Sequence, residues 1–223
     1  LENRENSGCR DWFCNVRFDR DNSFHDGLSY ENWGGYDLLV KLNHANPAVR
    51  QYLLDAVGFW IEEFDIDGIR LDAADVLDFG FMAALRGFTD SKKGDFWLMG
   101  EVIHGDYGRW LAPGMLHCVT NYRLHKALYS GHNDHNYFEI AHTVRETSQW
   151  KLYNFADNHD VARIASKLSA KSNFLPVHVL LYTLPGIPSV YYGSEFGIAG
   201  KKERWSDRNL RPELRLEDFR GNE

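Results

Sequence analysis

Three short apolar runs, each with an acidic residue just beyond it, constrain this chain more than any other feature. The three segments are GIRLDA (68–73), GEV (100–102) and FADNHD (155–160). Asp72 and Glu101 lie 29 residues apart, and Glu101 and Asp160 lie 59 apart. A (β/α)₈ barrel of ~250 residues gives each βα unit roughly 30 residues and carries its catalytic groups at the C-terminal strand ends. The spacing therefore predicts that Asp72 and Glu101 are one βα unit apart, and that Glu101 and Asp160 are two units apart.

Three carboxylates around one barrel mouth are the groups that glycosidic bond cleavage requires. The leaving oxygen needs a proton donor, and a retaining enzyme needs a carboxylate nucleophile ~5–5.5 Å from that donor. Neighbouring strands lie roughly 4.8 Å apart, so carboxylates at adjacent strand ends can meet this distance. The alternative is that all three are surface acids at strand ends. The sequence context of the three residues favours the catalytic interpretation.

These segments resemble the conserved regions of the α-amylase family of glycoside hydrolases (family 13), and its maltodextrin-, cyclomaltodextrinase- and neopullulanase-like members in particular. The matching segments are GIRLDA (68–73) at the fourth strand, WLMGEVI (97–103) at the fifth and FADNHD (155–160) at the seventh, with weaker matches at KLN (41–43) and GIPSVYYGSE (186–195). Their order and spacing agree with the family over nearly the whole chain.

The resemblance implies a role for each of these polar residues. Asp72 is the expected nucleophile, Glu101 the general acid and then base, and Asp160 the third carboxylate, which binds a hydroxyl pair of the distorted sugar. His159 is expected to donate to the same sugar ring. Arg70, two residues before Asp72 on a strand, points to the same face and can hold Asp72 ionised.

Two further segments bear on substrate preference. Asp207 and Arg211 resemble a loop that grips the non-reducing sugar in maltodextrin-processing relatives; the alternative is a surface ion pair. Asp75 and Val76 stand where many α-amylases carry Lys-His, which favours a maltodextrin, cyclodextrin or neopullulanase-like preference over an endo-acting starch enzyme. Acidic residues at EF-hand-like spacing are not found, so neither a metal nor a cofactor is predicted for this chain. Calcium is left open for the larger protein, without support from this sequence.

The predicted fold is α/β, a partial (β/α)₈ TIM barrel with about strands 4 to 8. Residues 1–37 are polar and aperiodic, and the resemblance implies the tail of the small domain inserted after the third strand. Residues 38–223 are predicted to form the C-terminal portion of the catalytic barrel. The first three strands and the first motif of the family have no counterpart here, so we expect a C-terminal part of a larger barrel.

The expected elements follow from local signals. Asn46 can cap a helix with Pro47 at its first position, and Val49, Leu53, Val57, Trp60 and Phe64 form one predicted buried stripe. Strands are predicted at 69–73, 96–102, 117–121, 151–156 and 189–192. Helices are predicted through Leu124 and Leu128 and over 177–184, with mostly loop from residue 197 onward.

Composition excludes some classes of partner. A net charge of −7 argues against nucleic acid and anionic membrane surfaces, and no apolar run of ~18 residues is present, so a membrane span is not expected. The three cysteines have no CxxC spacing and imply no disulfide framework. The N-terminal residues lack the apolar core of a signal peptide. These features predict a cytoplasmic protein.

The predicted function is a retaining α-glycoside hydrolase acting on α-1,4-linked maltodextrin- or starch-like glucans. A transglycosylase or an α-1,6-acting relative would use the same three carboxylates, so the sequence leaves both open. A non-catalytic glucan-binding or assembly fragment is the alternative from another class. The exposed edges of a partial barrel predict self-association, or pairing with the remaining barrel strands, and low activity of this chain alone.

Overall fold

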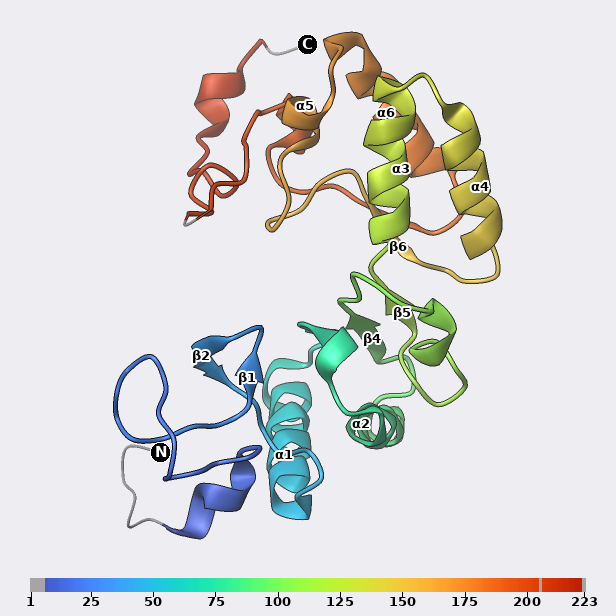
Figure 1. Cartoon of the computed structure of the whole chain (residues 1–223). Coiled ribbons are helices and arrows are strands. Elements are labelled where there is room, and N and C mark those ends of the chain that lie inside the picture. Colours follow the sequence, from blue (N-terminus) through green and yellow to red (C-terminus); the bar gives the residue numbers. More distant parts are fainter. Residues whose placement is uncertain (1–6, 205, 222–223) are drawn as a thin grey trace. The chain divides into compact units, whose positions relative to one another are not determined.

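The computed structural model describes residues 7–204 and 206–221 (Figure 1). The chain divides into two compact units, each built from two segments. The first unit comprises Leu1–Ile69 and Val76–Trp97, and the second comprises Arg70–Asp75 and Leu98–Glu223. The division between residues 37 and 38 stays a prediction, and residues 1–6 of its first part lie outside the described residues.

Strands and helices alternate along most of the chain. The strands are β1 (Asn32–Trp33), β2 (Tyr36–Val40), β3 (Gly68–Leu71), β4 (Trp97–Gly100), β5 (Cys118–Val119), β6 (Tyr153–Phe155) and β7 (Ile187–Ser189). The α-helices are α1 (Pro47–Phe64), α2 (Phe79–Lys92), α3 (Tyr122–Asn133), α4 (Tyr137–Thr147), α5 (Ile164–Lys167) and α6 (Phe174–Thr183). Short 3₁₀ turns are found at Ser7–Trp12, Ala74–Val76, Tyr107–Arg109, Lys171–Asn173, Ser194–Phe196 and Leu216–Phe219.

Strands β3 to β7 follow one another as neighbours. The order β3-β4-β5 forms one sheet and β6-β7 another, and a parallel bridge from Thr120 to Tyr153 joins β5 to β6. β4 pairs with β5, and β6 with β7, in parallel. Parallel strands align their C-terminal ends at one edge, so the loops after β3, β4 and β6 can contribute to one site.

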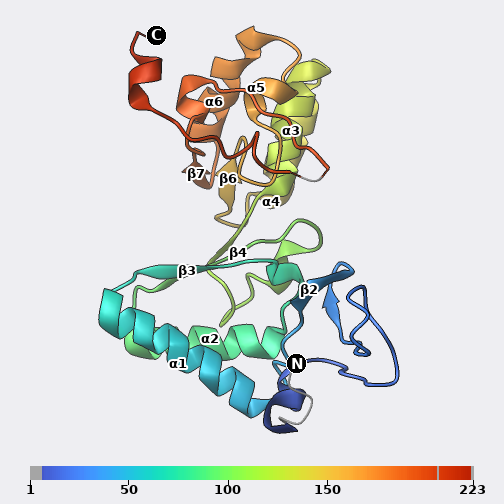
Figure 2. The same cartoon turned by 90° about the vertical axis from the view of Figure 1, so that its left-hand side faces the viewer.

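In the first unit, α1 and α2 pack against each other (Figure 2). The Asn46 side chain accepts a hydrogen bond from the Ala48 N–H at 2.9 Å, and Pro47 occupies the first turn, which confirms the predicted start of the helix. Asp65 ends α1 in a left-handed conformation with φ 49°. The cap satisfies an N–H group that the first turn leaves free.

The predicted buried stripe on α1 was partly wrong. Val49 and Val57 are buried, but Trp60 and Phe64 are 44% and 63% exposed. Gly58 explains the difference, since a Cβ there would lie 3.1 Å from the Phe88 ring. The close approach of α2 at this glycine turns the buried face away from Trp60 and Phe64.

In the second unit, α3, α4 and α6 lie together over β6 (Figure 1). Its hydrophobic core consists of Leu124, Ala127, Leu128, Ile140, Ala156, Ile164, Val177 and Leu181. The sequence predicted α3 and most of α6, but not α2 or α4. α4 buries only Ile140 and Thr147, so its apolar periodicity is weak.

The last strand lies earlier than predicted. β7 covers Ile187–Ser189, whereas the sequence predicted 189–192. Its three residues pair with the three of β6, and the ladder ends at Phe155 and Ser189. Tyr191 and Tyr192 therefore follow the strand rather than forming it.

The described helices include none with the length and apolar character needed to cross a bilayer.

Candidate active site

Asp72 and Glu101 each follow the last residue of a strand, and both belong to the second unit. The Glu101 N–H donates to the Leu71 carbonyl at 2.9 Å, which fixes the register of the two strand ends. Gly100 leaves room for side chains beside the strand end, because a Cβ there would lie 2.5 Å from the Leu116 side chain and 2.9 Å from the Ala74 side chain. The Asp72 side chain is 78% exposed and that of Glu101 is 10% exposed. The two carboxylates therefore differ sharply in their access to solvent.

Arg70 contacts both carboxylates. Its Nη1 lies 2.5 Å from Asp72 Oδ1, and its Nη2 lies 3.1 Å from Glu101 Oε2. The contact with Asp72 is the one that the strand alternation predicted. The contact with Glu101 was not predicted from the sequence, because it depends on the register between β3 and β4. One guanidinium thus holds the two acids close together.

The surroundings of Asp72 favour its charged form. Partial burial would raise the pKa of the Asp72 carboxyl, but the hydrogen bond and charge of Arg70 outweigh burial and leave that pKa lowered. Contact with Glu101 and the charge of His159 act in the same direction. Burial would lower the pKa of Arg70, but its acidic neighbours raise it. Both groups are therefore charged near neutral pH.

The turn after Asp72 contributes a backbone donor to Glu101. The Ala73 N–H donates to Glu101 Oε2 at 3.2 Å, and Ala73 has φ 43°, in the left-handed region. A non-glycine residue in this region is strained by about 1–3 kcal/mol and persists where its surroundings hold it. The buried Trp110 indole N–H donates to the Ala74 carbonyl at 3.0 Å, which anchors this turn.

Tyr122 completes the surroundings of Glu101, and the sequence analysis missed it. Its hydroxyl donates to Glu101 Oε1 at 3.0 Å, and burial raises the pKa of Tyr122, so the hydroxyl stays protonated. Asn121 caps α3 through the Leu124 N–H and so places Tyr122 at the first helical position. Tyr122 closely follows the end of β5, and this strand-end position was the available signal.

Asp160 is held by a turn that the preceding asparagine forms. Asn158 Oδ1 accepts the N–H groups of Asp160 and Val161 at 2.8 and 3.1 Å. The Asn158 amide also donates to the Tyr122 hydroxyl at 3.3 Å, which links this turn to Glu101. His159 Nε2 lies 3.0 Å from Asp160 Oδ2. Asn158, which was not predicted as a site residue, therefore links the turn that carries His159 and Asp160 to the surroundings of Glu101.

Asp207 and Arg211 form an ion pair at 3.1 Å, the alternative that the sequence left open, and the pair is not isolated. The same Arg211 nitrogen lies 3.3 Å from Asp160 Oδ1. Lys202, which the sequence analysis did not single out, donates to the Asp160 carbonyl oxygen at 2.8 Å. The C-terminal segment thus contacts Asp160 with two cations. The role of Asp207 and Arg211 in gripping a sugar stays a prediction.

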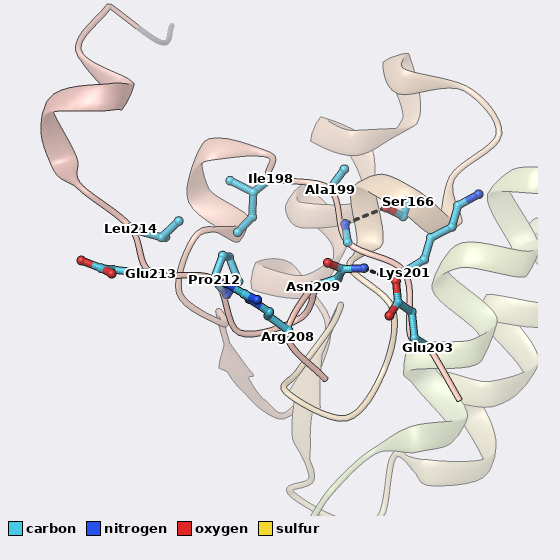
Figure 3. Close-up of a pocket in the computed structure, with 11 residues that line it drawn as sticks. Ser166, Ile198, Ala199, Lys201, Glu203, Arg208, Asn209, Pro212, Glu213 and Leu214 are labelled. Atoms are coloured by element: carbon cyan, nitrogen blue, oxygen red, sulfur yellow. Dashed lines mark hydrogen bonds between the residues drawn. The ribbon is translucent and has the colours of Figure 1, made fainter. Parts of the chain in front are cut away.

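The same C-terminal segment lines an open pocket of about 850 Å³ (Figure 3). Its lining residues are Ser166, Ile198, Ala199, Gly200, Lys201, Glu203, Arg208, Asn209, Pro212, Glu213 and Leu214. None of the predicted site residues lines this pocket. Over residues 7–204 and 206–221, no group of three or more His, Cys, Asp or Glu side chains is arranged to hold a metal ion.

Comparison with known families identifies the family of this chain. Residues 29–218 match the family model of the α-amylase catalytic domain. The chain belongs to the α-amylase family. The match spans all three acidic segments, so the family resemblance of the sequence is confirmed, as is the partial α/β barrel fold.

Similar members of the family include a maltogenic α-amylase and a cyclomaltodextrinase. The chain is 30% identical over 213 residues to a maltogenic α-amylase of Bacillus acidopullulyticus, covering 91% of this chain and 36% of that protein. It is 32% identical over 212 residues to a cyclomaltodextrinase of a Bacillus species, covering 90% and 37%. The chain therefore spans little more than a third of the length of these relatives.

Solved structures of the family share the fold. A cyclic α-maltosyl-(1→6)-maltose hydrolase of Arthrobacter globiformis, in complex with that cyclic sugar, superposes with a TM-score of 0.81 at 25% identity. The overlap covers 95% of this chain and 49% of that one. A debranching enzyme of Nostoc punctiforme gives a TM-score of 0.81 at 27% identity, covering 96% and 49%.

Proposed function

We propose that the protein containing this chain is a retaining glycosidase that hydrolyses α-1,4 links in maltodextrin-like glucans. One observation carries the proposal: a single guanidinium, Arg70, contacts both Asp72 and Glu101 at neighbouring strand ends. Double displacement uses a pair of neighbouring carboxyl groups, and the shared contact with Arg70 supports such a pair here. The names of the maltogenic and cyclomaltodextrinase relatives support the substrate class.

In the proposed mechanism, Asp72 attacks the anomeric carbon while Glu101 gives its proton to the departing glycosidic oxygen. A covalent glycosyl ester on Asp72 results, and the leaving sugar departs as an alcohol. Glu101 then takes a proton from water, whose oxygen displaces the Asp72 carboxylate and restores both groups. The exposed Asp72 is accessible to substrate, and its lowered pKa keeps it ionised for attack.

Tyr122 suits both states of Glu101, because a hydroxyl can donate to a carboxylate and accept from a carboxylic acid. Asp160 and His159 are proposed to bind the hydroxyls of the distorted sugar ring. Asp207 and Arg211 are proposed to bind a sugar further along the glucan, since Arg211 already contacts Asp160.

The stereochemistry of the product tests the proposal. Purified protein containing this chain should release the α-anomer from maltoheptaose, as followed by proton NMR during the first minutes. Asp72→Asn should abolish the release. Initial formation of the β-anomer would contradict the retaining mechanism, and no hydrolysis of any α-glucan would contradict the proposed function.

An α-1,6 preference is the second candidate. It is supported by similarity to a neopullulanase of Thermoactinomyces vulgaris and to the Arthrobacter globiformis and Nostoc punctiforme enzymes named above. Rates on pullulan and panose, compared with maltotriose, separate the two preferences. Product lengths at high substrate concentration separate hydrolysis from transglycosylation, since only transfer yields glucans longer than the substrate.

We also propose that the 223-residue chain alone self-associates and hydrolyses glucans poorly. In the described residues, β3 and β7 each pair with a strand on one side only, and unpaired edges promote association. The division into an inserted-domain tail (1–37) and barrel (38–223) belongs to the same proposal. So does a cytoplasmic location, supported by similarity to the intracellular maltogenic amylase of Bacillus subtilis.

Light scattering and turnover, measured on the chain alone, test the proposal of self-association and low activity. We expect particles larger than a monomer and weak hydrolysis. A stable monomer with ordinary turnover would overturn it.

A further inference from the structure

Arg163 is the largest fully buried side chain of the molecule's described part, and it contacts neutral oxygens. Nη1 donates to the Tyr192 carbonyl at 2.6 Å and the Ser194 hydroxyl at 3.3 Å, and Nη2 donates to the Leu210 carbonyl at 2.8 Å. The Ser194 hydroxyl donates in turn to buried Asp157 at 2.6 Å. A buried charge is costly unless it is hydrogen-bonded or paired. We therefore expect this side chain to have a role beyond packing.

The contacts of Arg163 join three segments that lie far apart in the sequence. Arg163 itself follows the Asp160 turn, Tyr192 and Ser194 follow β7, and Leu210 belongs to the C-terminal segment. The Arg163 N–H also donates to the Gly200 carbonyl at 2.9 Å. The approach at Gly200 is tight, because a Cβ there would lie 2.2 Å from the Asn209 carbonyl oxygen and 3.1 Å from Arg163 Cγ.

The segments that Arg163 joins are those that carry the groups around Asp160. Lys202, two residues after Gly200, donates to the Asp160 carbonyl, and Arg211, next to Leu210, reaches the Asp160 carboxylate. The Gly200 N–H donates to the Ser166 hydroxyl at 2.8 Å. The Asn209 amide donates to the Glu203 carboxylate (Figure 3). Most of these outer groups are exposed. The buried Arg163 guanidinium is hydrogen-bonded to the backbone of the segments that carry these groups.

A second route leads from Arg163 to His159. The guanidinium carbon lies 4.1 Å from the centre of the Tyr191 ring, a cation–π contact. The Tyr191 ring lies 6.4 Å from the His159 ring, centre to centre. Arg163 therefore contacts both the ring that packs near His159 and the segment that carries the cations around Asp160.

We propose that Arg163 is a positioning residue of the glycosidase: without touching substrate, it holds the Asp160 turn and the segment with Lys202, Asp207 and Arg211 in one arrangement. The proposal rests on the function proposed above. Small displacements of such groups have large effects on rate, since a shift of about 1 Å can cost on the order of 100-fold.

The test compares Arg163→Met and Arg163→Lys with Leu128→Ala in the protein containing this chain. Leu128 is fully buried in the hydrophobic core of the same unit and is not one of the proposed site residues, so it controls for a general loss of stability. Steady-state kinetics on maltohexaose and on an aryl maltoside are measured at temperatures at which every variant is folded.

We expect Arg163→Met to lower kcat/KM on maltohexaose by roughly 10- to 100-fold. The loss should be smaller on the short aryl substrate, which does not reach Asp207 and Arg211. Arg163→Lys keeps the charge and part of the hydrogen bonding, so it should restore part of the rate. Leu128→Ala should retain near wild-type kinetics. Equal losses in the Met and Ala variants, on both substrates, would overturn the proposal.

A readout that does not depend on activity separates this proposal from the proposed function. Trypsin cleavage after Lys201, Lys202 and Arg208 is timed by mass spectrometry in the same variants. We expect faster cleavage in Arg163→Lys than in Leu128→Ala. If the wild-type protein hydrolyses no glucan, the proposed function fails and the cleavage rates still decide the positioning role. Equal cleavage rates would refute it, and Arg163→Lys keeps the test open should Arg163→Met fail to fold.

Discussion

The environments of Glu101 and Asp160 are built in different ways. Glu101 is nearly buried and is held by a strand-borne arginine, a backbone N–H and the first residue of a helix. Asp160 lies in a loop and is contacted by its neighbour His159 and by exposed cations from a distant segment. Contacts within regular structure resist solvent and salt, whereas exposed ion pairs contribute little each. Substitutions should therefore have large effects around Glu101 and small ones at the exposed contacts of Asp160.

The largest expected effect is at the two strand-end carboxylates. Asp72→Asn should abolish turnover of every substrate, because no glycosyl ester can form. Glu101→Gln should lower kcat on maltooligosaccharides by about 10²- to 10⁴-fold, the usual contribution of a general acid. On an aryl glycoside with a good leaving group, formation of the ester needs no proton, so the loss in that step should be smaller. Burst kinetics measure it, and equal losses on both substrates would contradict the role of Glu101 as acid.

The next largest effect is expected in the pH dependence of rate and stability when Arg70 is replaced. Arg70→Met removes the charge that keeps the pKa of Asp72 lowered, so that pKa should rise and the acid limb of kcat/KM should move to higher pH. In the wild-type protein the lowered pKa of Asp72 also stabilises the folded state. This contribution is fully present at pH values above the pKa of an unfolded Asp, about 3.9, and is lost as the pH falls through the pKa of Asp72 in the folded protein. Arg70→Met should therefore show a weaker acid-dependent loss of stability. A pH–rate profile and urea titrations at several pH values measure both, and an unmoved acid limb would separate Arg70 from the ionisation of Asp72.

Tyr122 connects the surroundings of Glu101 to the turn that carries Asp160, and its substitution tests this connection. Tyr122→Phe removes hydrogen bonds to Glu101 and from Asn158 while keeping the ring. A hydrogen bond to a charged group contributes about 1.5–3 kcal/mol, so kcat/KM should fall by roughly 10- to 100-fold. Tyr129→Phe, a partly buried tyrosine on the same helix, serves as the matched control. Similar kinetics in the two variants would mean that the Tyr122 hydroxyl does not position Glu101.

The smallest effect is expected at the exposed pair of Asp207 and Arg211. Exposed ion pairs contribute about 0.2–1 kcal/mol, so Arg211→Ala should change stability little. KM for maltohexaose should rise a few-fold, while KM for maltotriose should change less if this pair binds a distant sugar. Added salt should weaken the wild-type contact in the same direction. Equal changes of KM on both substrates would argue against a distant sugar contact.

The strand-borne half of the site could be predicted from the sequence because its signals are local. Apolar runs followed by Asp72 and Glu101 set both the strands and their ends, and the two-residue alternation placed Arg70 beside Asp72. The start of α1 at Asn46 and Pro47 was equally local, since a cap depends only on neighbouring residues.

Other features depended on packing that no local pattern encodes. Trp60 and Phe64 were predicted to be buried, but the contact of Gly58 with Phe88 selects a different face of α1. β7 ends at Ser189 because its partner β6 ends there. α4 buries too few residues to produce a clear periodic pattern.

The sequence by itself determined the family, the order of the strands, and the positions of Asp72 and Glu101 at strand ends and of Asp160 in the loop after β6, because these signals lie in contiguous residues. Only the tertiary structure decided which groups surround those carboxylates. Tyr122 reaches Glu101 from α3, and Lys202 reaches Asp160 from the C-terminal segment. Arg163, in the loop after β6, contacts Leu210 in that segment. Their contacts span 21 to 47 residues along the chain, and such distances are bridged only when the strands and helices have packed.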